Sequence, residues 1–160
     1  FMLVSAIPYS KYIALVVFVV ASLTDTLDGY IARKYKLVSN FGKFMDPLAD
    51  KLLVSSAMIC LVSLNRIPAW VVIVIISREF IISGFRLVAS DAGVVIAASW
   101  WGKIKTVVQM IMVIVLILSI HNPVVAVIEQ ILIYLALVLT VVSLLDYLIK
   151  NWKVMDDGKM

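Results

Sequence analysis

Four aspartates between positions 25 and 50 are the residues whose type and spacing most clearly indicate chemistry. Asp25 and Asp28 are three positions apart, and Asp46 and Asp50 are four positions apart. On a helix, both spacings place the two side chains of a pair on one face. Carboxylates this close together do not all stay ionised without a counter-charge, and hard divalent cations such as Mg²⁺ or Mn²⁺ usually supply it. The stretch therefore predicts a metal site, and its two pairs suit two ions.

Small residues lie next to the acidic positions. Gly29 and Ala32 each follow an aspartate of the first pair by four residues, and Gly42 precedes the second pair by four. A helix face with almost no side chain lets a nucleotide or diphosphate approach the backbone, although close helix packing explains the pattern equally well. Arg33 lies beside this face, where we expect it to contact a phosphate rather than only anchor the helix at the membrane surface.

The composition points to a membrane protein. The chain has 160 residues, of which 64% are hydrophobic and 15% charged. These values do not fit an ordinary soluble domain and are typical of a bundle of membrane helices, which we expect to form one domain over residues 1–160. The net charge of +4 does not indicate nucleic acid, because no basic cluster alternates with exposed aromatic residues. No nucleic-acid partner is therefore expected.

Apolar segments of the right length recur along the chain. A membrane-spanning helix needs about 20 mostly apolar residues. The sequence also opens with an apolar run before Pro8, which we interpret as the tail of a first helix. We expect an all-α transmembrane bundle of six helices, with the first helix largely missing from this chain. The five remaining spans are expected at residues 12–32, 44–64, 67–87, 104–120 and 124–149.

The distribution of lysine and arginine orients these expected spans. If the loop at residues 33–43 is cytoplasmic, alternation leaves only Lys11 and Arg66 facing outward, in agreement with the positive-inside rule. The first two spans are then antiparallel and joined by a short loop, so the two aspartate pairs lie at one depth. Charges within a span usually face the bundle interior or a wet cavity. The expected site is therefore a cavity open to the cytoplasm.

The spacing of these residues resembles the signature of the CDP-alcohol phosphatidyltransferase family. Residues 40–53, 77–80 and 102–106 extend the likeness to the bacterial branch that makes phosphatidylglycerophosphate. The sequence departs from that branch at its front, where a polar motif and a first helix are usual. The eight positions that match the signature are Asp25, Asp28, Gly29, Ala32, Arg33, Gly42, Asp46 and Asp50.

The resemblance implies roles for these residues. Asp25, Asp28 and Asp46 would hold two divalent ions, Mg²⁺ or Mn²⁺, against the diphosphate of CDP-diacylglycerol. Asp50 would be the general base and would touch metal as well. The resemblance also implies a homodimer among the lipids of a bacterial inner membrane, with its active site facing the cytoplasm. The CDP-diacylglycerol would be bound by Asp28, Gly29, Ala32, Arg33 and Gly42.

Four basic residues beyond the aspartates indicate which alcohol attacks. Arg78 lies about two turns inside its span, where an unpaired cation is costly, and Glu79 projects about 100° away from it, so a local pair is not assured. Cations that converge on one cavity favour an anionic acceptor, whereas snorkelling to the interface is the alternative. Glycerol 3-phosphate and inositol phosphate both fit, and the resemblance favours glycerol 3-phosphate. The acceptor phosphate is expected to contact Arg78, Arg86, Lys103 and Lys105.

Two other functions also use intramembrane carboxylates. A membrane prenyltransferase binds a diphosphate through two Asp-rich motifs, but those motifs normally lie far apart in the sequence, and here both fall within 26 residues. A divalent-cation transporter would place acidic residues near the middle of the membrane, with a pathway to the outside. Here the carboxylates gather at one end of their spans, and a transporter leaves the basic residues unexplained. Phosphatidyl transfer is therefore favoured.

Overall fold

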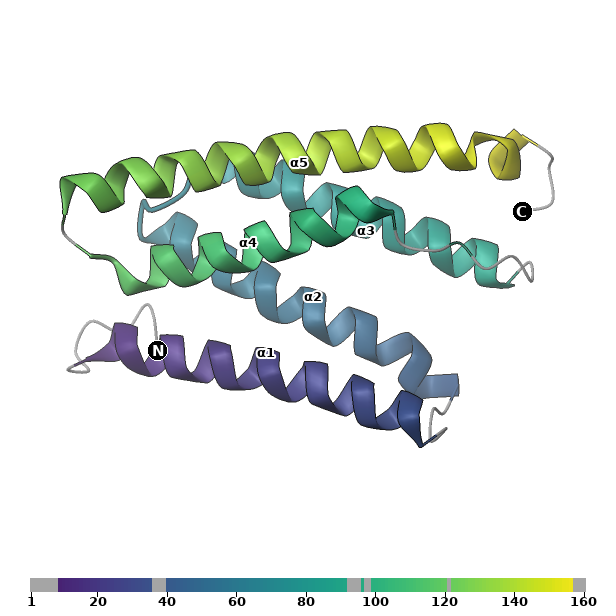
Figure 1. The fold of residues 1–160 in the computed structure, drawn as a ribbon, viewed down its shortest axis with the longest axis horizontal. Helices are drawn as coiled ribbons and strands as arrows, with labels where there is room; N and C mark the ends of the chain where they lie inside the picture. Colours follow the sequence, from purple (N-terminus) through teal and green to yellow (C-terminus); the bar gives the residue numbers. More distant parts are fainter. Residues whose placement is uncertain (1–8, 36–39, 92–95, 97–98, 121, 157–160) are drawn as a thin grey trace. The chain divides into compact units, whose positions relative to one another are not determined.

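The chain folds into helices throughout the described residues, which are 9–35, 40–91, 96, 99–120 and 122–156 of a computed structural model. The side chains of residues 25–26, 29–30, 32–33, 40–50, 91 and 152–156 lie outside this description. The all-α prediction is confirmed. The helices, shown in Figure 1, are α1 (Ser10–Lys34), α2 (Asn40–Ser63), α3 (Ala69–Asp91), α4 (Trp100–Leu118) and α5 (Pro123–Asp156).

Each expected span coincides with one helix, and capping residues set the precise ends. The helix α4 begins four residues earlier than expected, because Ser99 caps it: the Ser99 hydroxyl accepts a hydrogen bond from the Gly102 amide at 3.1 Å. At the start of α5, the side-chain oxygen of Asn122 accepts a bond from the Val124 amide at 2.9 Å, and Pro123 occupies the first helical position. An apolarity window does not detect these polar caps.

The end of α2 is also closed by local hydrogen bonds. Asn65 adopts a left-handed conformation with φ of 55°. The Arg66 amide donates to the Leu61 carbonyl, and the Asn65 amide donates to the Val62 carbonyl, both at 2.9 Å. This pair of bonds is a Schellman motif, in which asparagine substitutes for the usual glycine. The helix therefore stops at a defined residue before α3 begins.

Two compact units divide the chain, and the first consists of Phe1–Ile67 together with Val113–Ile120. Within it α1 and α2 pack against each other and run in opposite directions (Figure 1). The hydroxyls of Ser22 and Thr24 donate to carbonyls one turn earlier in α1, each at 2.8 Å, so these polar groups are satisfied within their own helix. Among the described side chains of these two helices, the buried apolar ones are Ala14, Phe18, Ala57, Met58 and Leu61.

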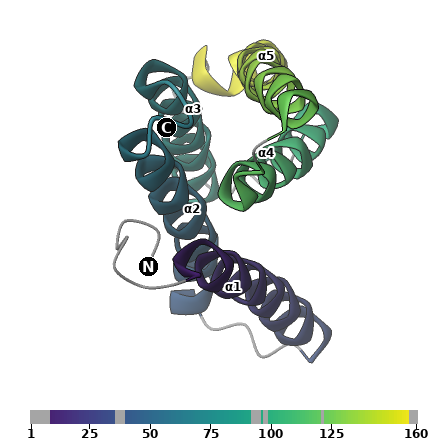
Figure 2. The ribbon, with the colours of Figure 1, turned by 90° about the vertical axis from the view of Figure 1, so that its left-hand side faces the viewer.

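The second unit consists of Pro68–Met112 and His121–Met160, and it contains α3, α5 and most of α4. The helices α3 and α5 pack against each other, and the C-terminal part of α5 lies next to α3 in Figure 2. Among their described residues, the fully buried apolar side chains are Val71, Ile75 and Ala89 of α3 and Ile133 and Ala136 of α5.

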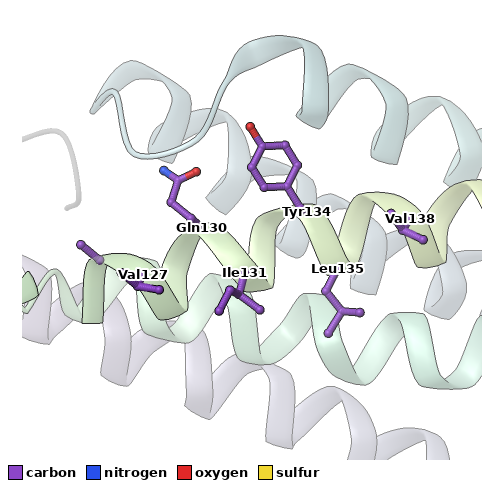
Figure 3. Close-up of a pocket in the computed structure, with 7 residues that line it drawn as sticks. Val127, Gln130, Ile131, Tyr134, Leu135 and Val138 are labelled. Atoms are coloured by element: carbon purple, nitrogen blue, oxygen red, sulfur yellow. The ribbon is translucent and has the colours of Figure 1, made fainter. Parts of the chain in front are cut away.

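Large apolar side chains cover much of the described surface. Along α5, a hollow of about 670 Å³ is lined by residues of that helix alone; Figure 3 shows Gln130 and Tyr134 among its apolar side chains. Exposed apolar surface of this extent is unusual for a soluble monomer. Both α4 and α5 are long and apolar enough to cross a bilayer. The fold therefore agrees with the predicted membrane bundle. The hollow is lined by Ala126, Val127, Gln130, Ile131, Tyr134, Leu135 and Val138.

Candidate active site

The four aspartates of the predicted metal site lie on the two helices of the first unit. Asp25 and Asp28 occupy the C-terminal half of α1, and Asp46 and Asp50 the N-terminal half of α2. Because α1 ends at Lys34 and α2 begins at Asn40, both pairs lie near the same end of an antiparallel helix pair. The Asp28 side chain is exposed. The side chains of the other three lie outside the described residues, so the ligand set stays a prediction.

The small residues and the arginine predicted to bind the nucleotide share these two helical segments. Gly29, Ala32 and Arg33 belong to α1, and Gly42 to the first turn of α2. Their surroundings lie outside the described part of the chain. Their helical backbone agrees with the periodicity on which the predicted acidic face depends.

Arg78 is the best-defined basic residue of the second unit. It is only 7% exposed, and its Nε donates to the Ser143 hydroxyl of α5 at 3.1 Å. That hydroxyl donates in turn to the Thr140 carbonyl at 3.0 Å. The Arg78 Nη1 lies 3.3 Å from Oε1 of Glu79, so the local pair that sequence left open does form. A guanidinium held by two partners has a fixed orientation.

Lys105 of α4 reaches the same carboxylate. Its side chain is fully buried, and its ammonium group forms an ion pair with Oε1 of Glu79. Glu79 therefore lies between two cations that come from different helices. Sequence predicted both cations as phosphate ligands and did not predict that they share a carboxylate.

Gly102 provides room for the arginine. A Cβ at this position would lie 3.2 Å from Nη2 of Arg78 and 3.5 Å from the Ser99 hydroxyl. The absence of a side chain thus lets the guanidinium lie close to the first turn of α4. The sequence signal for this contact is a glycine one turn into a helix, which is not specific enough to reveal the role.

The other two predicted basic residues have different surroundings. The Nε and Nη2 of Arg86 donate to the Ile96 carbonyl at 3.2 and 3.1 Å, which ties α3 to the segment that precedes α4. Lys103 is exposed, and its ammonium lies 5.9 Å from the centre of the Trp100 ring. The structure therefore brings Arg78 and Lys105 together on one carboxylate and places Lys103 at the surface.

Tyr147 of α5 also belongs to this region, and sequence did not reveal it. The residue is 3% exposed, and its ring packs edge-on against Phe85, with 6.5 Å between centroids. Its hydroxyl is buried without a hydrogen-bond partner among the described residues. From the sequence alone, a tyrosine in an apolar helix is normally interpreted as a core or interface residue, so no sequence signal indicated a role for Tyr147 at this site.

The all-α fold carries four aspartates on α1 and α2 and a buried cluster of Arg78, Glu79 and Lys105 on α3 and α4. The sequence model of the CDP-alcohol phosphatidyltransferase family matches residues 1–142 of this chain. The chain belongs to the CDP-alcohol phosphatidyltransferase family. This confirms the predicted family and the predicted enzyme class.

Relatives in three bacteria support the assignment. The chain is 49% identical over 152 residues to the CDP-diacylglycerol–glycerol-3-phosphate 3-phosphatidyltransferase of Bacillus subtilis, covering 92% of this chain and 78% of the relative. It is 40% identical to the enzyme of the same name from Haemophilus influenzae, with 87% and 77% covered. It is 38% identical to a probable phosphatidylglycerophosphate synthase of Mycobacterium tuberculosis, with 86% and 65% covered.

Proposed function

We propose that the chain transfers a phosphatidyl group from CDP-diacylglycerol to glycerol 3-phosphate, giving phosphatidylglycerophosphate and CMP. The names of the similar bacterial enzymes support this choice of substrates. The observation that carries it is the buried cluster of Arg78, Glu79 and Lys105, in which two cations share one carboxylate. The three side chains carry two positive charges and one negative charge, and Arg86 of the same helix as Arg78 carries a further positive charge. A phosphorylated acceptor would balance this excess.

The acceptor phosphate would be bound by Arg78, Arg86, Lys103 and Lys105. Among these, Arg78 is held at two of its nitrogens by two different side chains, Ser143 and Glu79. Guanidinium groups suit a phosphate because they offer paired donors at a fixed spacing. Serine, choline or ethanolamine would not need a cationic pocket.

The metal-binding role is assigned to Asp25, Asp28, Asp46 and Asp50. Members of this family generally use a divalent metal, and a donor set made only of carboxylate oxygens fits Mg²⁺ or Mn²⁺. Two ions are proposed because the carboxylates come in two pairs on neighbouring helices. When bound, such ions would neutralise the diphosphate and the departing CMP.

Each part of the chain then has a chemical task. The small residues Gly29 and Ala32 of α1 and Gly42 of α2, together with Arg33, would bind the CDP part of the lipid substrate. Asp50 would take the proton from the acceptor hydroxyl while the oxygen of that hydroxyl attacks the β-phosphorus. A new phosphorus–oxygen bond forms, the bond to the bridging oxygen of the diphosphate breaks, and CMP leaves with that oxygen.

We also propose that the protein is a homodimer in a bacterial inner membrane, with its active site facing the cytoplasm. The asymmetry of lysine and arginine along the chain supports this orientation. It places the acidic ends of α1 and α2 on the side where CMP and a water-soluble acceptor exchange. The diacylglycerol part would remain among the membrane lipids.

The first experiment measures CMP release by the purified full-length protein with CDP-diacylglycerol and Mg²⁺. Separate reactions receive glycerol 3-phosphate, inositol phosphate, serine or no acceptor. We expect release to depend on glycerol 3-phosphate. Release that depends on inositol phosphate instead would keep the reaction and overturn the acceptor. No release with any acceptor, from folded protein, would overturn the proposed reaction.

A further inference from the structure

The hydroxyl of Tyr147 is a buried hydrogen-bonding group with no partner among the described residues. The residue is only 3% exposed, and Phe85 packs against its ring edge, so the side chain cannot turn to bulk solvent without losing this contact. A buried hydroxyl left unpaired costs free energy, and natural proteins seldom leave one without a reason. A ligand that supplies the missing partner is such a reason.

The position of Tyr147 relates it to the basic cluster. Ser143 lies one helical turn earlier on α5, so the two side chains share a face, and Ser143 accepts the Nε bond of Arg78. Phe85, which contacts Tyr147, lies about two turns beyond Arg78 on α3. Tyr147 thus belongs to the same face of the α3–α5 contact as Arg78.

A second donor in this region is also unused. The Arg78 Nη2 makes no hydrogen bond to a residue in the described part of the chain, and it faces the bare backbone of Gly102. A hydroxyl donor next to a guanidinium with an unused nitrogen matches a group that has several acceptor oxygens and a negative charge. A phosphate meets both requirements.

We propose that the Tyr147 hydroxyl donates a hydrogen bond to the phosphate of the acceptor, beside Arg78, and so helps to select a phosphorylated alcohol. This inference rests on the proposed function. The neighbouring Asp146 carboxylate projects about 100° away from Tyr147 around α5; its Oδ1 pairs with Lys150 at 2.6 Å, and its Oδ2 is buried without a partner among the described residues. Glu79, the carboxylate next to Arg78, already accepts from two cations.

The test replaces Tyr147 with phenylalanine, which removes the hydroxyl and keeps the ring against Phe85. We expect the KM for glycerol 3-phosphate to rise about tenfold, as for a lost bond to a charged group. The inhibition constant of inorganic phosphate should rise in parallel. The KM for CDP-diacylglycerol and the melting temperature without ligand should stay unchanged, because the hydroxyl has no partner among the described residues.

Tyr134→Phe is the matched control, since Tyr134 is an exposed tyrosine of the same helix, and it should change none of these values. An unchanged KM and phosphate inhibition in Tyr147→Phe would overturn the inference. An equal rise in both KM values with a lower melting temperature would also overturn it, by showing a structural role. Failure of the proposed function itself would appear in the wild-type protein, as CMP release that does not depend on glycerol 3-phosphate.

Discussion

Lys105 and Glu79 form an ion pair between α4 and α3 in which the lysine side chain is completely buried. The same carboxylate oxygen accepts from Arg78. Desolvating three charged groups is costly, and their mutual attraction offsets the cost only while the set is complete. The cluster is therefore sensitive to the loss of any member.

Replacing Glu79 with glutamine leaves Arg78 and Lys105 buried without their shared carboxylate. We expect the free energy of unfolding to fall by about 3 kcal/mol, as is typical when one partner of a buried pair is removed. Denaturation in detergent, followed by circular dichroism, measures the change. Adding Lys105→Met to Glu79→Gln should restore part of the loss, because the double variant removes a stranded charge. Strictly additive losses would show that the pair is not coupled.

Lys105→Ala is expected to raise the KM for glycerol 3-phosphate more than the KM for CDP-diacylglycerol. The reason is that the variant removes positive charge from the proposed acceptor site and changes none of the four aspartates. Steady-state CMP release with each substrate varied in turn measures both constants. Lys11→Ala is the control, because Lys11 lies near the N-terminal end of the described residues. This variant should alter neither KM. Equal increases for both substrates in Lys105→Ala would indicate general damage to the fold.

Gly102→Ala tests the close approach of Arg78 to α4. The added methyl would lie 3.2 Å from Nη2, so the guanidinium must shift, and we expect kcat/KM for the acceptor to fall about tenfold, as for a loss of about 1.4 kcal/mol in binding. Gly84→Ala is a matched control within α3, because nothing lies within 4 Å of its added methyl. That control should keep full activity and gain up to about 1 kcal/mol of stability. Identical behaviour of the two variants would contradict the proposed positioning.

Asp50→Asn is expected to lower turnover by about 10²–10⁴-fold, the usual contribution of a general base. Because the substitution keeps the size of the side chain, binding of CDP-diacylglycerol should largely survive. Single-turnover CMP release measures the first quantity, and equilibrium binding of a fluorescent CDP-diacylglycerol analogue measures the second. Turnover near the wild-type rate would remove Asp50 from this role.

The helices and the family could be predicted from the sequence because both depend on local patterns. Apolar segments of about 20 residues define the spans, and eight fixed positions between Asp25 and Asp50 define the signature. Errors at helix ends, such as the early start of α4, arise because a single cap residue like Ser99 outweighs the apolar pattern.

The partners within the basic cluster could not be predicted, because they lie far apart in the sequence. Ser143 is 65 residues from Arg78, and Lys105 is 26 residues from Glu79. Nothing in the local sequence distinguishes Ser143 or Tyr147 from the other small or aromatic residues of an apolar helix. Their roles depend on which faces of α3 and α5 meet, which only the packed structure defines.

The Arg78–Ser143 bond joins two helices that are synthesised at different times, and this affects how α3 inserts into the membrane. As α3 leaves the ribosome it contains Arg78 and Glu79 near its centre, where a charge opposes insertion by about 2.5–3.5 kcal/mol, and Arg86 nearer its end. The partner hydroxyl arrives only 65 residues later, on α5, and the partner lysine of Glu79 on α4. The later helices α4 and α5 are long and apolar enough to cross the bilayer. We therefore expect stable insertion of α3 into the lipid to depend on the helices that follow it. Truncation after α3 would leave this segment at the membrane surface, where proteases can cleave it.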